Sequence, residues 1–116
     1  MTANESPPPT GSAPFSIDGV RDGGLYRLRL VGEFDIGGME AAQAALASAT
    51  ADGVPRLLID LSGLSFIDSS GLRFIIGARM RCEERGIELS IRRGAPAVQR
   101  IFEVTRLERL LPFEDA

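Results

Sequence analysis

Two adjacent serines beside an aspartate are the residues of this chain best suited to accept a phosphate. The run Asp68-Ser69-Ser70-Gly71 contains residue types that favour helix starts, and a long segment with helical apolar spacing follows it. A helix N-terminus carries partial positive charge and unpaired N–H groups, which suit a phosphate of about −1.5 to −2 charge. The pattern therefore offers hydroxyls at a position where the helix would tolerate phosphorylation.

The same serines also have a purely structural interpretation. A serine that precedes a helix is most often an N-cap, whose side chain accepts a backbone N–H and contributes about 1 kcal/mol. Residue types alone leave both roles open for Ser69 and Ser70. Asp68, together with Glu33 or Asp35 if they lie nearby, would oppose an added negative charge.

One edge of the helix predicted after these serines is the second candidate feature. At about 100° per residue, Ile76 and Met80 fall close to the direction of Ser69, and Arg73 lies beside them. They are either the shoulder of a wide apolar stripe or a docking strip beneath a modifiable serine. A partner packed on such a strip would not tolerate an uncompensated phosphate. The core side of this helix is predicted to consist of Gly71, Leu72, Ile75, Ala78 and Cys82.

Composition places the chain among small globular proteins. Its 116 residues suffice for one domain, and its 44% hydrophobic and 25% charged residues are ordinary for that class. The formal net charge of −3 argues against a nucleic-acid backbone as a direct partner. Neither a signal peptide nor an apolar run near the roughly 20 residues of a membrane span is visible, so a cytoplasmic, membrane-free location is expected.

Several kinds of chemistry are excluded by the residue inventory. There is no His and no Lys, and Cys82 is the only cysteine, so imidazole catalysis, amine chemistry and His-ligated or cysteine-cluster metal sites cannot be built. Asp60 and Asp68 could be taken for the acid pair of a receiver domain, but such a site also needs a lysine. We therefore expect a non-enzymatic protein with no metal and no cofactor.

The order of the predicted elements indicates an α/β fold. Met1 to Pro14 is rich in Pro and small residues and is predicted to be a disordered tail before a single domain over residues 15–116. Alternating apolar residues predict strands at 15–20 and 25–31 that pair as an antiparallel hairpin, with an acidic loop at 32–35. The remaining predicted elements are helices at 39–51, 69–85 and 95–104, strands at 57–61 and 87–91, and a terminal segment at 107–113, for which a strand is favoured over a frayed helical turn. These elements predict a mixed, mostly parallel sheet with helices packed on it.

The serine motif resembles that of a known family. Phe66-Ile67-Asp68-Ser69-Ser70-Gly71-Leu72 is similar to the phosphorylation signature of bacterial anti-sigma factor antagonists, which are small stand-alone STAS domains. Residues 30–35 resemble the family's second strand and acidic loop, and residues 95–102 resemble the start of its third helix. The resemblance extends over residues 15–113 and implies a STAS-like single domain. It also implies a further C-terminal helix, for which residues 111–116 are too short.

The resemblance implies a protein–protein switch. In that family the unphosphorylated antagonist binds an anti-sigma factor with a GHKL-type serine kinase fold and so releases a sigma factor. The kinase then phosphorylates the antagonist with ATP, and a PP2C-type phosphatase reverses the modification. By position in the motif the acceptor here would be Ser69. The other residues assigned to partner binding are Asp68, Ser70, Gly71, Arg73, Ile76, Met80, Glu33 and Asp35, the last two facing the kinase's basic surface.

A second hypothesis assigns the same fold a different molecular function. The chain could be a STAS-type scaffold that binds another partner or a small ligand, such as a nucleotide or lipid, without sigma control. Retained ligand binding without affinity for any GHKL-type kinase would favour this alternative.

Overall fold

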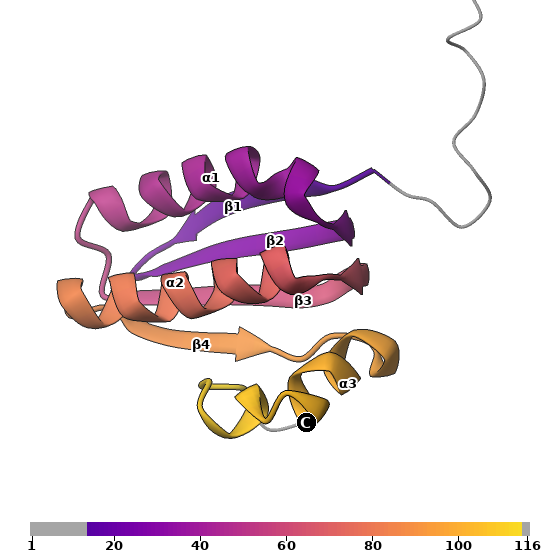
Figure 1. Ribbon diagram of the computed structural model, residues 1–116. Helices are drawn as coiled ribbons and strands as arrows, with labels where there is room; N and C mark the ends of the chain where they lie inside the picture. The colour runs from indigo at the N-terminus through magenta and orange to yellow at the C-terminus, as the bar shows by residue number, and fades with distance from the viewer. Residues whose placement is uncertain (1–13, 115–116) are drawn as a thin grey trace, which may run out of the picture.

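The computed structural model describes residues 14–114 and consists of one mixed sheet with helices on it (Figure 1). Apart from Pro14, the predicted disordered tail lies outside the described residues. The strands are β1 (Ser16–Asp22), β2 (Leu25–Phe34), β3 (Arg56–Ile67) and β4 (Glu88–Arg92), and the helices are α1 (Met39–Ala51), α2 (Ser69–Arg85) and α3 (Pro96–Val104). Within residues 14–114, no helix is both long and apolar enough to cross a membrane.

The sheet has the order β1-β2-β3-β4. The β1–β2 hairpin is antiparallel, whereas β2–β3 and β3–β4 are parallel and are connected through α1 and α2. Figure 1 shows α1 and α2 side by side on one face of the sheet, with α3 beyond β4. This arrangement confirms the predicted α/β, STAS-like fold with an N-terminal antiparallel hairpin.

The two central strands are longer than the sequence pattern predicted. The strand predicted at 57–61 continues to Ile67, and Glu33 and Phe34 belong to β2 rather than to an acidic loop. The extensions pair with each other, because Glu33 lies opposite Phe66 and Phe34 opposite Ile67 after two register shifts. Gly32, with φ of 92°, allows the strand to bend at the second shift, since a left-handed backbone favours glycine.

The core is organised around aromatic residues at the carboxyl end of β2. Phe34 is fully buried, stacks on Phe15 with ring centroids 4.4 Å apart, and meets Phe74 of α2 edge-on at 5.5 Å. Phe74 was not in the predicted core face of the helix, although it is 1% exposed. Cys82 is buried as predicted, and burial raises the pKa of its thiol, which suits an inert packing role.

Side-chain hydrogen bonds fix α2 against α1. Thr50 near the end of α1 donates its hydroxyl to the Leu46 carbonyl at 2.8 Å, and the Arg81 Nε of α2 donates to the same hydroxyl oxygen at 2.7 Å. Arg85 adds a contact of 3.4 Å from its Nη1 to the Thr50 carbonyl oxygen. These bonds hold the C-terminal half of α2, while aromatic packing holds its first turns.

The C-terminal segment differs from its prediction. The strand favoured at 107–113 is wrong over Leu107–Arg109, which forms a single 3₁₀ turn after Arg106 adopts a left-handed backbone with φ of 63°. Only Phe113 joins the sheet, through one parallel bridge to Ile91. The segment thus covers the outer edge of β4 only briefly.

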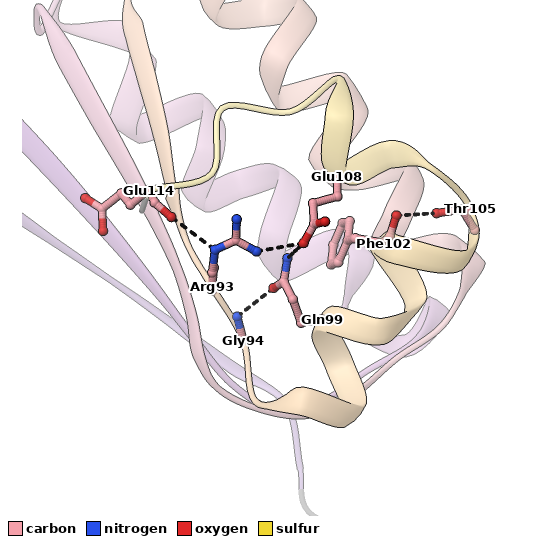
Figure 2. Close-up of polar contacts among 7 residues, drawn as sticks. All are labelled: Arg93, Gly94, Gln99, Phe102, Thr105, Glu108 and Glu114. Carbon is pink, nitrogen blue, oxygen red and sulfur yellow. Dashed lines mark hydrogen bonds and ion pairs between the residues drawn. The ribbon is translucent and has the colours of Figure 1, made fainter. Parts of the chain in front are cut away.

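A polar network, shown in Figure 2, attaches this segment to α3 and β4. Arg93 donates from Nη1 to Glu108 Oε2 at 2.7 Å and from Nε to the Glu114 carbonyl oxygen at 3.1 Å. The buried Gln99 accepts from the Gly94 N–H at 3.0 Å and donates to Glu108 at 3.4 Å. The network satisfies the amide of Gln99, which would otherwise be a costly buried polar group.

Substitution by alanine is expected to have opposite effects on stability at two glycines of α2. A Cβ at Gly71 would collide with Ile67 and lie 3.1 Å from Phe34 Cδ2, whereas a Cβ at Gly77 meets nothing within 4 Å. We expect Gly71→Ala to destabilise the fold by about 1–3 kcal/mol through overpacking. Gly77→Ala should stabilise it by about 0.5–1 kcal/mol through helix propensity. Urea denaturation measures both, and an equal effect at the two sites would contradict the packing of Gly71 described here.

The network in Figure 2 predicts a pH dependence of stability. Hydrogen bonds from Arg93 and then from Gln99 hold the pKa of Glu108 below its usual value. A depressed folded-state pKa contributes stability above the unfolded-state pKa, about 4.3, and this contribution is lost as the pH falls through the folded-state pKa. Glu108→Gln should therefore lower Tm at pH 7, with the difference shrinking below about pH 4.

The control for this prediction is Glu103→Gln. Glu103 is exposed on α3 and forms no ion pair among the described residues. A thermal-melt series from pH 3 to pH 7 in which both variants track the wild-type chain would show that Glu108 is not coupled to folding.

Candidate functional site

The start of α2 is capped by an aspartate rather than by a serine. Asp68 has an extended backbone, and its Oδ1 accepts from the Ser70 N–H at 2.9 Å and from the Gly71 N–H at 3.3 Å. Its own N–H donates to the Phe34 carbonyl oxygen at 3.2 Å, which fixes the cap at the end of the sheet. The interpretation of Ser69 or Ser70 as the N-cap is therefore wrong, because the carboxylate of Asp68 already serves the N–H groups that a serine would have served.

This assignment leaves the hydroxyl of Ser69 available. Ser69 is the first residue of α2 and its side chain is exposed, whereas Ser70 is only partly exposed. Among the hydrogen bonds of residues 14–114, none involves the Ser69 hydroxyl. Of the two candidates, Ser69 thus presents the more accessible oxygen to an incoming phosphate donor.

A second capped turn lies beside the first. Asp35 follows β2, and its side chain accepts from the Gly37 N–H at 2.9 Å to cap a 3₁₀ turn that leads into α1. Because Phe34 pairs with Ile67, Asp35 and Asp68 leave neighbouring strands at the same edge of the sheet. Glu33, half-buried, pairs with Phe66 one residue before this point. Glu33, Asp35 and Asp68 therefore lie at the ends of two paired strands, at the same end of the sheet as Ser69.

The edge of α2 that contains Ser69 stays outside the core. Arg73 is exposed, Ile76 is half-buried and Met80 is 56% exposed. Neither Ile76 nor Met80 belongs to the apolar cluster formed by the buried residues. Gly71, in contrast, is buried and packs closely against Ile67 and Phe34. The strip from Ser69 to Met80 is thus a solvent-facing surface of the described structure.

Sequence reasoning missed two apolar side chains at this edge. Ile36, the residue after the Asp35 cap, is 73% exposed, and Phe66, near the end of β3, is 47% exposed. For Phe66 the available signal was strand alternation, which places Ile67 in the core and therefore leaves Phe66 outside it. For Ile36 the signal was its position directly after the capping residue Asp35. Both were overlooked because the strands were predicted to end earlier.

The start of α2 offers a hydroxyl as a possible acceptor group. Within the described part of the chain no group of three or more His, Cys, Asp and Glu side chains is placed to hold a metal ion. What the site does present is an exposed hydroxyl at the positive end of a 17-residue helix, beside acidic and apolar groups. These features suit recognition by a macromolecule.

The capping assignment predicts unequal effects at adjacent positions. Asp68→Ala removes the acceptor for two N–H groups and should lower the free energy of unfolding by about 0.5–2 kcal/mol. Ser69→Ala removes a hydroxyl that forms no hydrogen bond within residues 14–114, so its free energy of unfolding should stay within about 0.5 kcal/mol of the wild-type value. Denaturant titration distinguishes the two, with Asp68→Asn as the control that keeps a capping oxygen. A larger loss in Ser69→Ala than in Asp68→Ala would reverse the assignment.

Comparison with known proteins identifies the family. Residues 20–112 match the family described as "Mlab, STAS domain". The chain is 25% identical over 97 residues to the anti-sigma-B factor antagonist of Staphylococcus aureus (strain NCTC 8325 / PS 47), covering 84% of this chain and 90% of that protein. It is 30% identical over 81 residues to the anti-sigma F factor antagonist of Lysinibacillus sphaericus, covering 69% of each.

Solved structures show the same fold. An anti-sigma factor antagonist from Mycobacterium paratuberculosis superimposes with a TM-score of 0.80 at 25% identity, covering 90% of this chain and 91% of that chain. The anti-sigma factor antagonist SpoIIAA in its unphosphorylated form gives a TM-score of 0.72 at 24% identity, covering 89% and 88%. By this match over most of its length, the chain belongs to the STAS-domain family of anti-sigma factor antagonists.

Proposed function

We propose that this protein is a phosphorylation-controlled anti-sigma factor antagonist. In its unphosphorylated form it binds an anti-sigma factor with a GHKL-type serine kinase fold and thereby frees a sigma factor. Phosphorylation of Ser69 by that kinase ends the interaction, and a PP2C-type phosphatase restores it. The protein acts in the cytoplasm as a binding partner and not as an enzyme.

The observation that carries this proposal is the exposed Ser69 hydroxyl beside a cap made by Asp68. Because the aspartate holds the helix start, the Ser69 oxygen can attack the γ-phosphorus of ATP without breaking a structural hydrogen bond. The Oγ–P bond forms, the bond from phosphorus to the β-phosphate oxygen breaks, and ADP leaves. The hydroxyl proton passes to a base of the kinase.

Relatives of the chain support this proposal. Anti-sigma factor antagonists from two species match most of its length, and SpoIIAA, which shares the fold, has been solved in a phosphorylated form. Carried to this chain, such a modification falls on Ser69 by its place in the motif and by its accessibility.

The physical basis of the switch would be a charge introduced into a docked surface. Phosphate at the first residue of α2 is compatible with the helix, because the N-terminus is electropositive. It would nevertheless stand among Glu33, Asp35 and Asp68, which repel it. In a desolvated interface an unpaired charge costs several kcal/mol, enough to release a partner while leaving the fold intact.

The remaining site residues have proposed roles at the same surface. Glu33 and Asp35 would face basic groups near the nucleotide site of the kinase. Arg73, Ile76 and Met80 would provide the docking strip along α2. Ser70 and Gly71 would complete the helix start, whose close packing sets the position of Ser69.

Phosphorylation by GHKL-type kinases of the source organism, followed by mass spectrometry, tests the proposal. We expect ATP-dependent modification of the wild-type chain at Ser69, none in Ser69→Ala, and full modification in Ser70→Ala as the matched control. Ser69→Asp should weaken kinase binding at least tenfold, about 1.4 kcal/mol, whereas Ser69→Ala should bind in the presence of ATP without being released.

Two outcomes would contradict the proposal. Continued modification of Ser69→Ala would place the acceptor elsewhere. Failure to bind any GHKL-type kinase, combined with retained binding of a nucleotide, a lipid or another protein, would favour a scaffold role without sigma control.

A further inference from the structure

We propose that Ile36 and Phe66 are apolar anchors that dock the kinase acting on Ser69, and that the kinase surface they meet is an apolar patch with a basic rim. This inference rests on the proposed function, because it assigns the partner's contact chemistry at the same site. It adds residues on the sheet side of Ser69 to the strip already described on α2.

The backbone ties both residues to the junction that positions Ser69. Phe66 is three residues before Ser69 and lies opposite Glu33 in the β2–β3 register. The next pair joins Phe34 to Ile67, and the Asp68 N–H donates to the Phe34 carbonyl oxygen. Ile36 is two residues beyond Phe34 and is held by the turn that Asp35 caps. The β2–β3 register and the Asp35 cap therefore place both residues at the end of the sheet from which Ser69 emerges.

Neither side chain has a packing role that accounts for its presence. Ile36 is 73% and Phe66 47% exposed, and both are absent from the apolar cluster and from the partly buried residues that pack against it. Single exposed apolar residues are common on protein surfaces. Here two large ones lie at the ends of paired strands that lead into the start of α2, one in β3 and one in the turn after β2, and this placement is suited to contact with a macromolecular partner.

The surrounding charges specify the chemistry of that partner. Glu33, Asp35 and Asp68 lie at the same end of the sheet, so the two exposed apolar residues have acidic neighbours. A complementary surface would therefore offer apolar side chains within a ring of Arg or Lys. A kinase meets this requirement naturally, because it needs basic groups where it holds ATP phosphates next to the acceptor. Anionic membranes and nucleic acid do not supply an apolar, basic surface of this kind.

The proposed anchors affect binding of the kinase and not the phosphoryl-transfer step. Ile36 and Phe66 do not touch the transferred phosphate, so they would contribute equally to the ground-state complex and to the transition state. Their loss should raise the KM for the protein substrate and the Kd of the complex, with kcat nearly unchanged. An altered helix start would instead change kcat, because it would misplace the Ser69 oxygen.

The experiment compares Ile36→Ala, Phe66→Ala and the double variant with Leu110→Ala, using the purified kinase that modifies Ser69. Leu110 is a matched control because it is 61% exposed yet lines a separate hollow beside Arg79, Cys82 and Glu83. We expect each anchor variant to raise Kd and KM by about 5- to 30-fold, the range of interface residues worth about 1–2 kcal/mol. Leu110→Ala should stay within about twofold of the wild type.

Weaker binding by Phe66→Ala could also come from disturbed strand ends, so Ile36→Arg provides an independent test of the anchor role. Ile36 is the more exposed of the two, so the arginine costs the fold little, but it would face the basic rim of the kinase and should weaken binding more than Ile36→Ala. Unchanged urea midpoints for Ile36→Ala and Ile36→Arg would confirm that the fold is intact.

The outcomes separate this inference from the proposed function. If the wild-type chain is modified at Ser69 while the anchor variants keep wild-type Kd and KM, the anchors are wrong and the proposed function stands. A fall in kcat at constant KM would also overturn the anchor role. If no GHKL-type kinase binds or modifies the wild-type chain, the proposed function fails and the anchor assignment fails with it.

Discussion

The hydrogen bonding of one carboxylate determines how the candidate site is presented. Asp68 closes the end of β3 through its N–H bond to Phe34 and opens α2 by accepting two backbone N–H groups. Asp68 performs both tasks between the buried Ile67, which ends β3, and the buried Gly71 in the first turn of α2. The following hydroxyl is then held at a fixed place without taking part in the structure itself. A site that must be modified without unfolding the domain requires this separation.

The acidic cap also weakens the attraction of the start of α2 for a further negative charge. The dipole of α2 and its remaining N–H groups attract an anion, but the Asp68 carboxylate already occupies part of that favourable region. A phosphate on Ser69 would be stabilised by the helix and repelled by its neighbours, so the domain can carry it without strong internal pairing. Its main effect is then directed outward, at whatever surface lies against Ser69.

Sequence patterns predicted the antiparallel N-terminal hairpin, the three helices and the strands between them, and these agree with the structure because period and propensity are local signals. They failed where pairing between distant residues decides the outcome. The last residues of β2 and β3 are strands only because each supplies the other's partner, and a bulge with a left-handed Gly32 is needed to align them. Phe74 was missed as a core residue for a related reason: its burial depends on Phe34, which the pattern had placed in a loop.

The same limit explains the candidate site. The motif indicated Ser69, but residue types could not show whether Asp68 or a serine caps the helix, since all are good N-cap residues. The exposed positions of Ile36 and Phe66 follow from where the long strands end, and that information lies in the β2–β3 register rather than in either segment alone. A short motif thus indicates the proposed acceptor, whereas the surface proposed to recognise it is assembled by contacts that only the folded chain contains. Specificity for a partner would therefore be tuned at the strand ends, with the acceptor motif itself left unchanged.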